Sequence, residues 1–86
     1  MHSEASVVVP PGVGLHARPA ALFVQQAGGY ASQIRLRAGG READGKSILA
    51  LLQLGAGAGS ELTIVADGDD ADAAVSGLVA FVRNLA

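Results

Sequence analysis

The sequence is organised around one short stretch, residues 14–21, which reads GLHARPAA. Proline is favoured in the first turn of a helix, where its missing N–H is not needed, and Pro19 is followed by a run of helix-forming residues. His16 and Arg18 are therefore expected at, or just before, a helix N-terminus, which offers unpaired N–H groups and a partial positive charge. A histidine, an arginine and such a helix end together make a place to hold a phosphoryl group.

The rest of the chain predicts four strands and three helices. Strands with alternating or β-branched patterns are expected at residues 5–10, 32–37, 41–44 and 61–67. Helices with one apolar face are expected at residues 19–27, at 47–54, and from 69 or 70 to about 85. The order β-α-β-β-α-β-α predicts a two-layer α+β domain whose sheet has one face under the helices and one in water. His2 is expected to be a disordered terminal residue with no role.

The composition of the chain excludes several classes of protein. Eighty-six residues make one small domain spanning residues 1–86. The absence of cysteine excludes disulfides and thiolate metal sites. A formal net charge of −2 without a basic cluster argues against nucleic-acid binding. No apolar run approaches the ~20 residues that cross a bilayer, and the N-terminus lacks the pattern of a signal peptide. We therefore expect a soluble, cytoplasmic protein.

The second helix carries more apolar surface than a small domain can bury. Its apolar residues cover well over half of the helix circumference, whereas a surface helix normally buries a stripe of about 100°. They are Ile48, Leu49, Leu51, Leu52 and Leu54. We expect Leu49 and Leu52 to be exposed. Together with Ile48 they form a candidate docking surface for protein partners.

His16 has the chemistry of a phosphoryl acceptor. Neutral imidazole is a good nucleophile, and its unperturbed pKa is about 6.5. A helix N-terminus disfavours the protonated ring and then attracts the negative charge of a bound phosphoryl group, by roughly 0.3–1 kcal/mol. Arg18, two residues away, suits the role of a phosphate clamp. Such binding holds a phosphoryl group without making its transfer irreversible.

Residues 14–21 as a whole resemble the active-site signature of HPr, the histidine-containing phosphocarrier of the bacterial phosphoenolpyruvate-dependent sugar phosphotransferase system. The resemblance continues through Lys46-Ser47-Ile48, Leu54-Gly55 and Gly68-Asp69-Asp70. It implies an open-faced β-sandwich, in which a four-stranded antiparallel sheet carries three helices on one face.

The resemblance also implies a function. His16 would take a phosphoryl group on Nδ1 from Enzyme I and pass it to IIA domains of sugar permeases. Ala17 and Pro19 would form the helix N-terminus at the phosphate, and Leu15 would join the partner surface. The protein would be a monomeric phosphoryl carrier rather than a turnover catalyst, with no metal and no cofactor.

Two positions bear on regulation and on the active loop. Ser47 is a good helix N-cap, and in HPr proteins of many Gram-positive bacteria the matching serine is phosphorylated by an HPr kinase/phosphorylase. Asp44 stands where those regulated proteins usually have asparagine, and its charge would repel a phosphate on Ser47. Val13 stands where family members often carry Asn or Ser, so a side-chain hydrogen bond to the loop or the phosphate is lost.

Two alternatives remain beside a carrier for sugar uptake. In the first alternative, the protein serves a regulatory, nitrogen-related phosphotransferase branch, and its IIA partners are then different proteins. Alternatively, it is a small ligand-binding or interaction module with ferredoxin-like layers, in which case the spacing within residues 14–21 is a coincidence.

Overall fold

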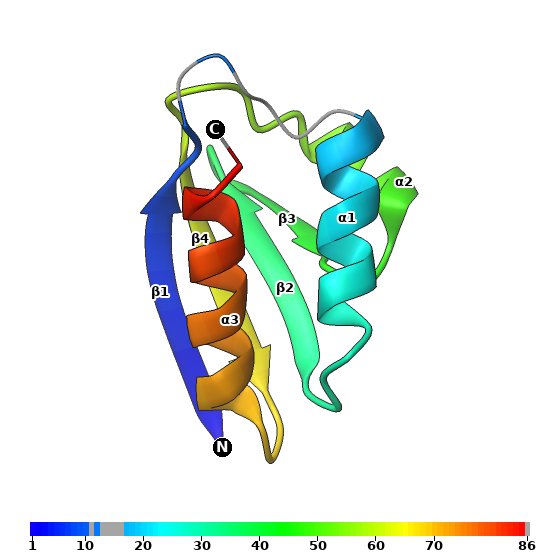
Figure 1. Ribbon diagram of the computed structural model, residues 1–86, viewed down its shortest axis with the longest axis vertical. Helices are drawn as coiled ribbons and strands as arrows, with labels where there is room; N and C mark the ends of the chain where they lie inside the picture. Colours follow the sequence, from blue (N-terminus) through cyan, green and yellow to red (C-terminus); the bar gives the residue numbers. More distant parts are fainter. Residues whose placement is uncertain (11, 13–16, 86) are drawn as a thin grey trace.

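One four-stranded sheet and three helices make up the computed structural model, which describes residues 1–10, 12 and 17–85 (Figure 1). The strands are β1 (His2–Val8), β2 (Gln33–Ala38), β3 (Arg41–Asp44) and β4 (Glu61–Asp67). The helices are α1 (Ala17–Ala27), α2 (Ile48–Leu54) and α3 (Ala71–Arg83). The helices lie on one side of the sheet, as expected for an open-faced β-sandwich, with α3 over β1 and β4 and α1 beside it.

The strand order in the sheet is β1-β4-β2-β3, and every neighbouring pair is antiparallel. A two-residue turn joins β2 to β3, because Ala38 pairs with Arg41. Gly39 and Gly40 have φ values of 55° and 79°. Positive φ at both central residues is what a two-residue type I′ hairpin requires, and glycine adopts it without a steric penalty.

The core lies between the sheet and the helices. Each of the two inner strands, β2 and β4, contributes a pair of fully buried aliphatic side chains. These are Ile34, Leu36, Leu62 and Ile64. From the helical layer, Phe23 of α1 is also fully buried and meets Phe81 of α3 edge to face, at a centroid distance of 6.1 Å. This arrangement confirms the face assigned to the helices by the alternating pattern of the strands.

The expectation for His2 was wrong, because β1 begins at His2 rather than at residue 5. The additional residues pair in register with the end of β4, from His2 opposite Asp67 to Ala5 opposite Ile64. Their inward-facing side chains, Ser3 and Ala5, are small and only partly buried. A strand without large apolar residues gives little signal in the sequence, so backbone pairing and polar contacts decide its extent.

Two helix ends also differ from expectation. Helix α1 begins at Ala17, so Pro19 is its third residue, where a missing N–H is still harmless because the first four N–H groups of a helix have no partner within it. Asp70 is the N-cap of α3 by position, but its side chain makes no cap hydrogen bond. Its carboxylate instead accepts from the backbone N–H of Ala31 and from the N–H and hydroxyl of Ser32. Helix α3 ends at Arg83, two residues before the expected end.

Candidate functional site

The residues expected to carry the chemistry lie around the N-terminus of α1. Val13, Leu15 and His16 fall outside the described residues, and His16 directly precedes Ala17, the first residue of α1, in the sequence. Arg18 and Pro19 lie in the first turn of the helix, where the Arg18 side chain is exposed and Pro19 is partly buried. The first turn contains no acidic residue that would compete with a bound anion. The start of α1 therefore presents one cation, beside a helix end that favours negative charge.

Helix α2 exposes the apolar residues that the sequence analysis assigned to a docking surface. The exposed fractions are 43% for Ile48, 66% for Leu49 and 41% for Leu52, while Leu51 is fully buried. The predicted exposure of Leu49 and Leu52 is therefore confirmed. We call Ile48, Leu49 and Leu52 the α2 apolar patch.

On the helix that packs against α2, one exposed apolar residue was missed by the sequence analysis. Leu22 on α1 has an exposed fraction of 42%, and α1 packs against α2. Its position in the sequence carries a signal, since it falls outside the apolar stripe that Phe23 and Ala27 define on the same helix. Apolar surface is thus exposed on both neighbouring helices.

Ser47 caps α2, as the sequence analysis expected. Its φ and ψ are −121° and 114°, and its hydroxyl oxygen accepts from the backbone N–H of Ala50 at 3.2 Å. Asp44 lies in the same turn, where its Oδ1 accepts from the Lys46 N–H at 2.9 Å and its carbonyl accepts from the Ser47 N–H at 3.2 Å. A carboxylate therefore stays close to the Ser47 backbone.

One open hollow of about 490 Å³ is lined by residues of β1, β2, β3 and β4, Glu4, Arg37 and Thr63 among them, and by none of α1. Within residues 1–10, 12 and 17–85 there is no group of three His, Asp or Glu side chains that could hold a metal ion. None of the described helices is both long enough and apolar enough to span a membrane.

Comparison with known proteins identifies the family. A family model described as the PTS HPr component phosphorylation site matches residues 3–84. The chain is 42% identical to the phosphocarrier protein HPr of Cupriavidus necator over 72 residues, which are 84% of this chain and 81% of the relative. It is also 42% identical to the HPr-like protein Crh of Halalkalibacterium halodurans over 80 residues, which are 93% of this chain and 95% of the relative.

A solved structure gives the same result. The phosphocarrier protein HPr from Bacillus anthracis matches with a TM-score of 0.89 at 40% sequence identity, and the match covers 94% of this chain and 96% of that one. The fold and the family model together define a small phosphotransferase-system component. The chain belongs to the HPr family of phosphocarrier proteins.

Proposed function

We propose that this protein is a phosphocarrier that accepts a phosphoryl group on Nδ1 of His16 from Enzyme I and passes it to IIA domains for sugar uptake. The phosphoryl group would originate from phosphoenolpyruvate. One observation supports this most directly: in a chain of the HPr family, the GLHARPAA stretch places His16 immediately before α1, and Arg18 lies in the first turn of that helix.

The transfer of the phosphoryl group requires few groups beyond His16, Arg18 and the N-terminus of α1. The lone pair of the neutral imidazole forms the P–N bond while the bond between the phosphoryl group and its donor breaks, and the reverse exchange delivers the group to the next protein. Arg18 and the N–H groups of the first turn stabilise the added negative charge. A carrier that acts on a group held by another protein needs an accessible histidine rather than a closed cavity.

We assign the docking surface to Leu15 and to the α2 apolar patch. Three exposed aliphatic side chains on one short helix are the kind of surface that a protein partner covers. Leu22 on the neighbouring helix extends the exposed apolar area toward α1. The same proposal includes a monomeric carrier, which sedimentation of the unmodified protein tests.

The decisive experiment is labelling with phosphoenolpyruvate and Enzyme I. The wild-type protein should gain one acid-labile phosphate, and the His16→Ala variant should gain none. His2→Ala is the matched control, because it removes the other of the two histidines and should leave labelling intact. Arg18→Gln should still be labelled, but more slowly. Undiminished labelling of His16→Ala would overturn the assignment.

A regulatory, nitrogen-related phosphotransferase branch is the alternative within the same family. The phosphorelay chemistry is identical, so labelling by Enzyme I does not separate the two. Transfer from the phosphorylated protein to a panel of purified IIA domains does, because the sugar-uptake proposal requires that sugar-specific IIA domains accept the group. Acceptance by nitrogen-related IIA proteins alone would favour the regulatory branch. A ligand-binding module with ferredoxin-like layers does not fit a chain whose residues 3–84 match the HPr family model.

Ser47 is a candidate regulatory site for an HPr kinase/phosphorylase. Its hydroxyl is only partly buried and borders Ile48 of the α2 apolar patch, so a phosphate there would add charge beside the docking surface. Asp44, in the same turn, opposes that modification. Incubation with such a kinase and ATP should label the wild type weakly, Asp44→Asn more strongly, and Ser47→Ala not at all. Equal labelling of Ser47→Ala and the wild type would exclude this site.

A further inference from the structure

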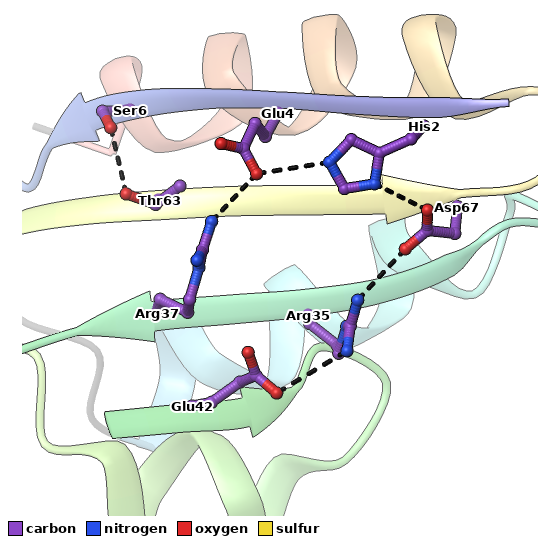
Figure 2. A network of polar contacts seen from close by, with 8 residues as sticks. All are labelled: His2, Glu4, Ser6, Arg35, Arg37, Glu42, Thr63 and Asp67. Atoms are coloured by element: carbon purple, nitrogen blue, oxygen red, sulfur yellow. Dashed lines mark hydrogen bonds and ion pairs between the residues drawn. The ribbon is translucent and has the colours of Figure 1, made fainter. Parts of the chain in front are cut away.

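The open face of the sheet, opposite the helices, carries a chain of polar contacts that crosses all four strands (Figure 2). His2 on β1 lies between two carboxylates, with Nδ1 at 2.6 Å from Asp67 Oδ1 on β4 and Nε2 at 3.3 Å from Glu4 Oε2 on its own strand. Each carboxylate also meets an arginine of β2, with Arg35 at 3.1 Å from Asp67 and Arg37 at 2.9 Å from Glu4.

This geometry requires a particular charge state of His2. A neutral imidazole carries one N–H and can donate to only one of two acceptors, whereas an imidazolium donates from both ring nitrogens. Ionised carboxylates only accept hydrogen bonds. His2 therefore satisfies Glu4 and Asp67 at the same time only when it is protonated.

The charges around His2 lead to the same conclusion. On the open face, β1 presents Glu4, β4 presents Asp67, β2 presents Arg35 and Arg37, and β3 presents Glu42, which lies 3.7 Å from Arg35. The network thus holds three carboxylates but only two guanidinium groups. A protonated His2 supplies the missing positive charge among these contacting groups, while Asp44, opposite Arg35, and Glu61, opposite Val8, add further negative charge on the same face.

The side of β1 that faces the core differs between the two ends of the strand. For this reason the polar contacts on the open face matter at one end only. The inward-facing residues of its first half, Ser3 and Ala5, are small and partly exposed. In contrast, Val7 and Val9 have exposed fractions of 5% and 0% and anchor the other end in the core. The first half of β1 therefore depends on backbone pairing with β4 and on the open-face contacts of His2 and Glu4.

We propose that His2 is a proton-operated latch that holds the N-terminal half of β1 against β4. When His2 is protonated, it bridges Asp67 of β4 and Glu4 of β1, and the half-strand stays paired. When His2 loses its proton, one of the two carboxylates loses its imidazole donor and keeps only its arginine, the contacting groups carry an uncompensated negative charge, and residues 2–5 open more often. The core-anchored end at Val7 and Val9 stays closed in both states.

The direction of the pH effect follows from the contacts. The hydrogen bond to Asp67, followed by that to Glu4, raises the pKa of His2 above its ordinary value of 6.5. The latch is therefore fully closed below about pH 6.5 and is released as the pH rises through the raised pKa. The contact with His2 lowers the pKa of Asp67 from 3.8, so the latch also fails in strong acid, as the pH falls through that lowered value.

The first test is a titration of the His2 imidazole by NMR in the full-length protein, with the urea-unfolded chain as reference. The pKa should be higher in the folded protein. Asp67→Asn should lower it more than Glu4→Gln does, because the contact with Asp67 is the larger cause. A folded pKa equal to the unfolded one would overturn the latch.

The second test compares hydrogen exchange at the two ends of β1. The Gly68 N–H donates to the Met1 carbonyl at 2.9 Å and reports the latched end, while the Val9 N–H donates to the Ser60 carbonyl at 2.9 Å and reports the anchored end. Between about pH 5.5 and 8.5, the protection of the Gly68 N–H against exchange should fall relative to that of the Val9 N–H. The expected fall is tenfold for each unit by which the pKa of His2 in the folded protein exceeds its pKa in the unfolded chain. Val9 provides the internal reference in the same molecule.

Variants separate the latch from a general effect of pH. His2→Gln should give a Gly68-to-Val9 ratio that no longer depends on pH. Ser6→Ala is the matched control, because it removes the neutral contact between Ser6 and Thr63 (3.0 Å) in the same strand pair and should leave the pH dependence intact. A constant ratio in the wild type, or an equal fall in His2→Gln, would refute the proposal. Neither test involves phosphorylation of His16, so they stand apart from the phosphocarrier assignment.

Discussion

Gly68 shows how one residue joins the two layers of the fold. Its φ is +150°, and a Cβ built on it would lie 2.7 Å from Cα and 3.0 Å from Cβ of Ser32. The following turn carries Asp70, whose carboxylate accepts from the N–H groups of Ala31 and Ser32. The start of β2 and the start of α3 are therefore packed together at backbone distance, where a side chain has no room.

We predict that Gly68→Ala destabilises the protein by about 2 kcal/mol, because the backbone conformation and the contact with Ser32 both oppose a side chain. Urea unfolding followed by circular dichroism measures the loss. Gly57→Ala is the matched control, since its φ is not positive and no atom lies within 4 Å of the added methyl group. It should change the stability by no more than about 0.5 kcal/mol. Equal losses in the two variants would contradict this account.

At this scale, the sequence predicts residues whose chemistry is local and misses those whose role depends on distant partners. Ser47 was predicted as a cap because an N-cap bonds to its own helix. Asp69 or Asp70 was expected to cap the third helix, yet the carboxylate of Asp70 accepts from Ser32, which is far away in the sequence. The sequence alone indicates a disordered His2, because its partner, Asp67, is far away in the sequence. No local pattern reports such pairs.

Among the elements, α2 has one side that packs in the core and one side that is exposed. Leu51 is fully buried in the core, while Leu49, two residues earlier, has an exposed fraction of 66%. The two leucines share one short helix and one residue type, so they separate stability from docking.

We predict that Leu51→Ala lowers the free energy of unfolding by about 2–5 kcal/mol, because it leaves a cavity in the core. Leu49→Ala should change it by less than about 0.5 kcal/mol. In the phosphotransfer assay, Leu49→Ala should nevertheless slow the exchange with Enzyme I and with IIA domains. Wild-type exchange rates in Leu49→Ala would remove this residue from the docking surface.

The elements also show why the sequence analysis succeeded for α2 and was incomplete for β1. An apolar arc wider than a small domain can cover implies exposed leucines, whatever the details of packing. The first half of β1 has no comparable excess, because Ser3 and Ala5 neither demand burial nor forbid it. For the candidate site, the signature around His16 was visible as a motif, whereas the exposure of Leu22 was visible only as a leucine outside the apolar stripe of its helix.

At the scale of the whole molecule, the stability of the fold is expected to fall on both the acid and the alkaline side. Hydrogen bonds from His2 and from Ser32 lower the pKa values of Asp67 and Asp70, respectively, from 3.8, so their contributions are present above that value and are lost as the pH falls through the lowered ones. The raised pKa of His2 acts in the opposite sense, since its contribution is complete below 6.5 and is lost as the pH rises through the raised value.

We predict that the urea midpoint is highest between about pH 4 and 6.5 and declines on both sides. The decline on the alkaline side should disappear in His2→Gln, and that on the acid side should shrink in Asp70→Asn. Because these groups lie at the surface, about 1 M salt should flatten the profile. A midpoint that rises steadily from pH 6 to 9 would show that the network on the open face does not contribute in the way described.

The strand order was not accessible from the residues alone. Three of the strands show the same kind of alternation, so the pattern indicates which face is buried and leaves the neighbours open. The resemblance of residues 14–21 to the HPr signature implied a four-stranded antiparallel sheet, and the structure adds the order of its strands, β1-β4-β2-β3.

The central place of β4 has a consequence for synthesis on the ribosome. Both β1 and β2 pair with β4 and not with each other, and β4 is the last strand in the chain. Until Glu61–Asp67 has left the exit tunnel, the hairpin of β2 and β3 is the only part of the sheet that can pair natively. Although β1 is synthesised before the other three strands, it therefore has no partner strand until β4 has emerged.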